Sequence, residues 1–204
     1  FKIAEREWLN DKKMTMLGRF ALQKLLKQML SAGCVYAVIE TSSQGIEQFR
    51  HSAIHYDICV FTNLTPEHIE AHGGFENYKK AKLKLFKHLE NLPTKKINEQ
   101  AIEKSIIVNG DDLHSSDFLN FNIKNKIVFG LKDNCNPRAD NIIYQKTGVA
   151  FNVLGNNFAL KLFGLFNVYN SLAVIAVSNA LGFDNLKTKS ALEGVSGIPG
   201  RMEL

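Results

Sequence analysis

The chain has 204 residues, of which 45% are hydrophobic, enough to bury one good core. Its net charge is +5, but the lysines are dispersed and no nucleic-acid module is recognisable, so we expect no nucleic-acid partner. No apolar run approaches the length of a membrane span and the first residues form no signal peptide, so we expect no membrane partner.

The first half of the chain alternates helix and strand patterns. Residues 17–30 have helical spacing of leucines and Gly33 is a stop signal just beyond them. The apolar run Cys34–Ile39 predicts a strand covered on both faces in a parallel sheet, and residues 57–61 repeat that pattern. A helix over 75–89 follows.

The second half continues the alternation and then changes character. Short apolar runs at 106–108 and 126–129 predict two further strands, and the residues after the first, Asn109 to Asp112, predict a turn. Short alternating runs over about 141–162 predict antiparallel hairpins. Two helices are expected at the end, over 167–181 and 186–192.

These patterns define a fold class. We predict an α/β fold with a mainly parallel sheet flanked by helices and a small antiparallel β appendage over about 141–162. No convincing linker divides the chain, so we expect one domain over 1–204. Three cysteines without a CxxC pair, Cys34, Cys59 and Cys135, predict reduced thiols in a cytoplasmic protein.

Lys82 is the unusual residue of the helix over 75–89. Lys80, Lys84 and Lys87 fall on its polar face, whereas Lys82 lies four residues after Tyr78 and four before Phe86, within the apolar stripe. A lysine in this position must extend its ammonium to solvent, be paired, have a shifted pKa or be chemically modified.

Further polar residues are expected beyond the carboxyl ends of neighbouring strands. Glu40 follows one predicted strand and Thr62 follows the next, while His68 lies in the second loop. Functional groups gather at this edge of parallel sheets. A carboxylate is a hard ligand for Mg²⁺, and a histidine can be recruited in a well-shaped site, so this edge could hold Mg²⁺ with a nucleotide triphosphate.

Each of these features has an alternative. His68 and His72 could share a helical face as zinc ligands, but the glutamate between them does not match HExxH. Ser42 and Ser43 could be nucleophiles, but GxSxG is absent and hydrogen bonding to a substrate is preferred. Asp111 and Asp112 are expected to form a turn, and we assign them no further role.

Four segments in register carry a family resemblance. They are ETSSQGIEQFR (40–50), TNLTPEHIEAHG followed by YKKAKLKLF (62–86), FNVYNSLAVIAV (166–177) and GIPGRMEL (197–204). Together they resemble the central domain of the Mur ligases, of the MurE type, from about Met14 to the last residue. The resemblance implies a P-loop NTPase-like domain of an ATP-dependent ligase that adds the third amino acid to UDP-N-acetylmuramoyl-L-alanyl-D-glutamate (UDP-MurNAc-dipeptide) in peptidoglycan synthesis.

The resemblance also implies site residues. Glu40, His68 and Lys82 match the metal site, in which Lys82 would be carbamylated by CO2 and serve catalysis with Mg²⁺; the resulting anion would no longer repel the metal. The other matching positions fall into two groups: Thr15, Ser42, Gln48 and Arg50 on the side of the UDP-MurNAc-dipeptide, and Asn167, Asn170 and Arg201 on the side of ATP. The expected partners are this dipeptide and an amino acid, and a monomer is expected.

The chain departs from the family pattern in several places. The phosphate loop GxxxxGK(S/T), the amino-terminal UDP-binding domain and the carboxy-terminal domain are absent, and there is no initial methionine, so we expect an inactive fragment. The usual Thr-Thr pair appears as Thr15-Met16, and Gln44 replaces a common histidine. The alternatives are a folylpolyglutamate synthase-like or cyanophycin synthetase-like ligase, or a non-catalytic nucleotide-sugar binding module.

Overall fold

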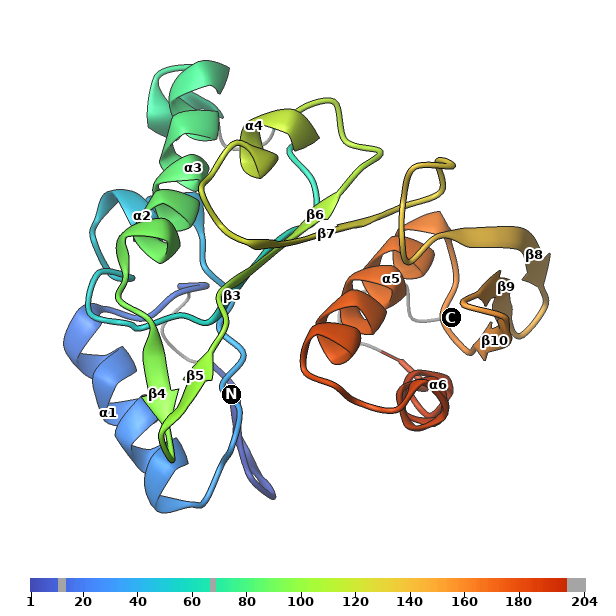
Figure 1. Ribbon diagram of the computed structural model, residues 1–204, viewed down its shortest axis with the longest axis horizontal. Coiled ribbons are helices and arrows are strands. Elements are labelled where there is room, and N and C mark those ends of the chain that lie inside the picture. Colours follow the sequence, from blue (N-terminus) through green and yellow to red (C-terminus); the bar gives the residue numbers. More distant parts are fainter. Residues whose placement is uncertain (11–13, 67–68, 198–204) are drawn as a thin grey trace. The chain divides into compact units, whose positions relative to one another are not determined.

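A computed structural model describes residues 1–10, 14–66 and 69–197. The chain divides into two compact units, and Figure 1 shows the elements of each. Unit 1 contains residues 1–55 and 66–91, and unit 2 contains residues 56–65 and 92–204. The described helices of both units are too short or too polar to span a membrane.

Unit 1 consists of a short hairpin and helices. Its elements are β1 (Lys2–Ile3), β2 (Arg6–Glu7), α1 (Arg19–Ser31), α2 (Ser43–Glu47), the 3-10 helix η1 (Ile69–His72) and α3 (Phe75–Asn91). Leu22 is the buried residue of α1, and Gly33 adopts a positive φ of 74° just beyond that helix, as its predicted role of stop signal requires. Ile46 of α2 is 1% exposed, and α2 packs against α3.

Helix α3 confirms the predicted division of its lysines. Its buried residues, Tyr78, Ala81, Phe86 and Leu89, lie on one side of the helix and form one apolar face. Lys80, Lys84 and Lys87 are exposed, whereas Lys82 is half-buried. The helical spacing therefore located the unusual lysine correctly.

The strand predicted at Cys34–Ile39 is wrong. These residues form no regular element in the structure, and Val35 and Val38 are 83% and 98% exposed. An apolar extended segment becomes a strand only when a neighbouring backbone pairs with it, and among the described residues none does so. Glu40 therefore follows an extended, exposed segment instead of a strand end.

Unit 2 contains the predicted parallel sheet. Strands β3 (Ile58–Phe61), β6 (Ser105–Asn109) and β7 (Asn125–Phe129) lie side by side in the order β3-β6-β7. Every residue of β6 is buried, as expected for a central strand with covered faces. Phe61 stacks on Phe118 of α4 (Ser115–Leu119) on one face, with ring centroids 3.7 Å apart.

The other face of this sheet meets the second layer of unit 2. Ile107 and Phe129 belong to a buried cluster with α5 (Leu165–Ala180) and with the antiparallel sheet of strands β10-β9-β8. These strands are β8 (Ala139–Gln145), β9 (Gly148–Val153) and β10 (Asn156–Leu160), which confirms the predicted appendage. Helix α6 (Asn185–Glu193) is tied to β10, because Glu193 accepts a hydrogen bond from the Ala159 amide at 2.8 Å.

The fold class is therefore confirmed as α/β, with a three-stranded parallel sheet and small antiparallel sheets. The hairpin β4 (Lys95–Ile97) and β5 (Gln100–Ile102) was not predicted, nor were β1, β2, α2 and α4. Helix α5 begins two residues before its predicted start, so Gly164, with a φ of 88°, is its N-cap. Asn167 therefore lies inside the first turn and is not the N-cap residue.

Candidate functional site

A row of contacts in unit 1 connects α2 to the middle of α3. The hydroxyl of Ser43 lies 3.0 Å from Nε2 of His72, at the end of η1. The His72 ring lies against Tyr78, with centroids 5.4 Å apart, and Nζ of Lys82 lies 5.0 Å from the centre of the Tyr78 ring. The attraction between an ammonium and an aromatic face helps to hold Lys82 on the apolar side of α3.

The Ser43–His72 contact has the composition of a nucleophile and base, but its environment favours a structural role. Ser43 is 7% exposed and begins α2, so its hydroxyl faces His72 inside the fold. Ser42 is also engaged, because its hydroxyl accepts a hydrogen bond from the Gly45 amide and caps α2. These contacts fix the segment that follows Glu40.

The proposed metal residues are only partly described. Glu40 is exposed and Lys82 is half-buried, both within unit 1, whereas His68 lies outside the described residues. Over residues 1–10, 14–66 and 69–197, no three histidine, cysteine, aspartate or glutamate side chains gather as a metal site. The set of Glu40, His68 and Lys82 stays a prediction.

Arg50 brings together three of the predicted substrate residues. Its guanidinium donates to the carbonyl of Met16 and to Oε1 of Gln48, and it lies 3.6 Å from the Met14 sulfur. The turn that carries the exposed Thr15 is therefore held beside Gln48 and Arg50. A planar guanidinium offers its donors in a fixed fork, which the ammonium of a lysine does not reproduce.

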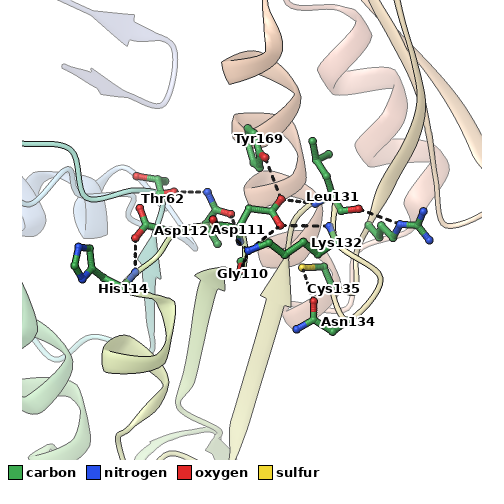
Figure 2. A network of polar contacts seen from close by, with 12 residues as sticks. Thr62, Gly110, Asp111, Asp112, His114, Leu131, Lys132, Asn134, Cys135 and Tyr169 are labelled. Carbon is green, nitrogen blue, oxygen red and sulfur yellow. Dashed lines mark hydrogen bonds and ion pairs between the residues drawn. The ribbon is translucent and has the colours of Figure 1, made fainter.

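In unit 2 the turn after β6 joins the end of that strand to the loop after β3, as Figure 2 shows. Nδ2 of Asn109 donates to the Thr62 carbonyl at 2.8 Å. The carboxylate of Asp112 accepts from the amides of Leu64 and His114, both at 2.8 Å. The prediction of a turn was correct, but this turn also fixes the loop after β3.

The neighbouring Asp111 contacts two other parts of unit 2 (Figure 2). Its carboxylate accepts from the amides of Leu131 at 2.6 Å and Lys132 at 3.3 Å, and from the hydroxyl of Tyr169 at 3.0 Å. Burial, followed by the hydrogen bond to Asp111, raises the pKa of Tyr169 to about 12. The sequence signal was the pair of carboxylates directly after a buried strand, and it was interpreted only as a turn.

The predicted nucleotide residues lie in the first turns of α5. Asn167 is 5% exposed and donates from Nδ2 to the Phe163 carbonyl at 2.8 Å. Nδ2 of Asn170, which is exposed, lies 3.4 Å from Oδ1 of Asn167. The two asparagines are thus adjacent on the helix, while Arg201 lies outside the described residues.

The comparison with known proteins identifies the family of the chain. The family described as the Mur ligase middle domain matches residues 2–178, through both units. The chain belongs to the Mur ligase family.

Relatives of the MurE type resemble nearly the whole chain. A UDP-N-acetylmuramyl-tripeptide synthetase of Roseiflexus sp. is 35% identical over 100% of this chain and 41% of its own length. A UDP-N-acetylmuramoyl-L-alanyl-D-glutamate--2,6-diaminopimelate ligase of Geobacillus thermodenitrificans is 36% identical over 89% of this chain and 37% of its own. The chain therefore spans about two fifths of the length of these relatives.

A solved structure gives the same result for the fold. The structure of a UDP-N-acetylmuramoyl-L-alanyl-D-glutamate--2,6-diaminopimelate ligase matches with a TM-score of 0.79 and 27% identity, over 92% of this chain and 38% of the other. The expected resemblance to MurE-type central domains is therefore confirmed, and so is the Mur ligase middle-domain fold.

Proposed function

We propose that this chain is the central domain of an ATP-dependent ligase that adds the third amino acid to the UDP-MurNAc-dipeptide. The observation that carries the proposal is the family match through both units, over residues 2–178. The relatives named as tripeptide synthetase and diaminopimelate ligase support this substrate class.

The proposed reaction joins a carboxylate to an amine at the expense of ATP. A carboxylate oxygen of the dipeptide attacks the γ-phosphorus of ATP, and the bond to ADP breaks. The amine of the amino acid then attacks the acyl carbon, the amine proton is lost, and phosphate leaves with one former carboxylate oxygen. The work of the protein is to position the reactants and to neutralise charge.

Glu40 and Lys82 of unit 1 suit Mg²⁺ only when Lys82 carries a carbamate. Glu40 offers an exposed carboxylate, which is a hard oxygen ligand. Lys82 as an ammonium would repel the ion, but a carbamate on Nζ would be an anion at the same place on α3. We propose that Glu40, His68 and carbamylated Lys82 hold Mg²⁺, which would neutralise charge on the transferred phosphoryl group.

A second set of residues in unit 1 is proposed to bind the substrate. The contacts of Arg50 with Met16 and Gln48 bring Thr15, Gln48 and Arg50 together. Ser42 caps α2, the helix that precedes Gln48. We propose that they bind the UDP-MurNAc-dipeptide, with Arg50 opposite a carboxylate or phosphate. In unit 2, Asn167 and Asn170 would contact the adenine side of ATP and Arg201 its phosphates.

Product formation by the complete gene product tests the proposal. The protein is incubated with ATP, Mg²⁺, the UDP-MurNAc-dipeptide and, in turn, lysine, meso-diaminopimelate or another amino acid, and products are identified by mass spectrometry. A UDP-MurNAc-tripeptide that requires all components supports the proposal. Ligation only to folate or to a polypeptide would favour another superfamily ligase, and binding of the nucleotide sugar without ATP turnover would favour the non-catalytic module.

Residues 1–204 alone are proposed to be inactive and to bind ATP only feebly, because they contain no GxxxxGK(S/T) loop. Calorimetry with Mg-ATP on this chain measures the affinity. Tight binding would show that the main phosphate contacts lie within the chain itself.

A further inference from the structure

The carboxylate of Asp111 is the best-connected acidic group of the turn after β6. Its side chain is only 12% exposed and accepts from the Leu131 amide at 2.6 Å and from the Tyr169 hydroxyl at 3.0 Å, while Nζ of Lys132 lies 3.9 Å away (Figure 2). Hydrogen bonds to an ionised acceptor are shorter and stronger than neutral ones. Asp111 therefore joins three segments that are distant in sequence: the end of β6, the loop after β7 and the start of α5.

Close packing around Asp111 limits where its carboxylate can move. A Cβ atom added at Gly130 would lie 2.7 Å from Oδ2 of Asp111 and 2.8 Å from the sulfur of Cys135. A Cβ atom added at Gly110 would lie 2.8 Å from the same sulfur. Gly130 thus approaches the carboxylate as closely as a residue without a side chain allows, and Gly110 approaches the neighbouring sulfur of Cys135 in the same way. The acceptor is held in a defined place.

Tyr169 donates this hydrogen bond from the first turns of α5. It lies between Asn167 and Asn170, in the first turns of the helix. The rest of α5 is held by buried apolar residues such as Leu172 and Ile175, and apolar packing is not directional. A hydrogen bond constrains direction as well as distance, so it can fix the rotation and the axial position of the first turns.

We propose that Asp111 is a positioning residue that, through the Tyr169 hydroxyl, sets the placement of Asn167 and Asn170 for the nucleotide base. The inference rests on the proposed function, because it assigns the asparagines to the adenine side of ATP. It deepens that function, since it links base recognition to the turn after β6.

Kinetics of Tyr169→Phe in the complete gene product test the proposal, because this change keeps the ring and removes only the hydroxyl. We expect the KM for ATP to rise about fivefold to tenfold while kcat changes less than about twofold. Asp111→Asn should raise the KM for ATP at least as much, and the double variant no more than Asp111→Asn alone. A coupled pair gives this non-additivity.

Asp112→Asn is the matched control, since Asp112 is in the same turn and accepts hydrogen bonds from two backbone amides but, among the described residues, makes no hydrogen bond to α5. Its effect should add to that of Tyr169→Phe. Additive effects of Asp111→Asn and Tyr169→Phe, or a loss of thermal stability with an unchanged KM for ATP, would overturn the positioning role.

An NMR measurement separates this inference from the proposed function. The ζ-carbon resonance of isotopically labelled Tyr169, identified by its loss in Tyr169→Phe, should shift in Asp111→Asn and stay in place in Asp112→Asn. An unmoved resonance in Asp111→Asn would refute the link itself. If the unmutated protein neither bound nor used ATP, the proposed function would fail and the positioning role with it, whatever the NMR result.

Discussion

The hydroxyl of Ser43 and Nε2 of His72 lie 3.0 Å apart, although the residues are separated by 29 positions in the sequence. The contact joins the start of α2, which follows Glu40, to the end of η1, which precedes α3. His72 in turn lies against Tyr78, over whose ring Lys82 is placed. The segments expected to supply metal ligands are thus held together by residues that need not touch the metal.

Removing the Ser43 hydroxyl should weaken metal binding more than folding. Residues that orient metal ligands typically contribute about tenfold to a hundredfold to metal affinity. We expect Ser43→Ala to raise the Mg²⁺ concentration for half-maximal ligation by about tenfold. Ser52→Ala is the control, because Ser52 is exposed and its hydroxyl donates to the nearby Phe49 carbonyl. An unchanged Mg²⁺ requirement in Ser43→Ala would show that the contact does not serve the metal site.

Lys82→Ala should nearly abolish ligation by the complete gene product, because it removes the group that would become the carbamate. Bicarbonate with a short-chain carboxylic acid should restore part of the activity by supplying an anion at the same place. Lys80→Ala serves as the control, since Lys80 is exposed on the same helix. Full activity of Lys82→Ala without any addition would refute the catalytic role of Lys82.

Arg50→Lys should weaken binding of the UDP-MurNAc-dipeptide. The change keeps the charge but removes the planar fork that contacts Met16 and Gln48. One charge-assisted contact is worth about 1.5–3 kcal/mol, so the KM for the dipeptide should rise roughly tenfold to a hundredfold. The KM for ATP should stay nearly constant. Arg138→Lys, at an exposed arginine paired with Asp133, is the control, and an effect of Arg50→Lys confined to ATP would reverse the assignment.

His51 predicts a pH dependence of stability. It is 5% exposed, and burial, followed by the neighbouring His88 and Lys84, lowers its pKa to about 4 from 6.5. Between these values the unfolded chain binds a proton that the folded chain does not. The free energy of unfolding should therefore decrease as the pH falls from 6.5 toward 4, by at most about 1.4 kcal/mol per pH unit.

Thermal unfolding between pH 7 and pH 4 measures this contribution of His51, because the range spans its pKa in the unfolded and in the folded chain. His51→Gln should flatten the decline, because glutamine does not titrate. His114→Gln, at a half-buried histidine of unit 2, should leave the decline as it is. The same pH slope in His51→Gln and in the unmutated protein would contradict the prediction.

Local patterns were sufficient for most of the fold. The central strand β6 and the helix α3 were predicted because burial follows directly from their apolar spacing. The segment Cys34–Ile39 was wrong because strand formation depends on a pairing partner, which the segment itself does not encode. The predicted start of α5 was two residues late because the helix begins at Leu165, directly after Gly164 as its N-cap.

The candidate site could be predicted from the sequence only where its residues lie within one short segment. The helical spacing placed Lys82 on the apolar face, and one short segment, 42–50, contains Ser42, Gln48 and Arg50. By contrast, Asp111 and Tyr169 are 58 positions apart, and no periodicity relates them. Their contact follows from the packing of α5 against the parallel sheet, which only the folded chain defines.

The proposed ligation through an acyl phosphate is tested most directly by following an oxygen atom of the acceptor carboxylate. The UDP-MurNAc-dipeptide is labelled with the heavy oxygen isotope in the carboxylate that accepts the amino acid, and the complete gene product is supplied with ATP, Mg²⁺ and that amino acid. Ligation through an acyl phosphate must transfer one labelled oxygen to each phosphate released, in step with tripeptide formation. Release of unlabelled phosphate alongside the tripeptide would contradict the account.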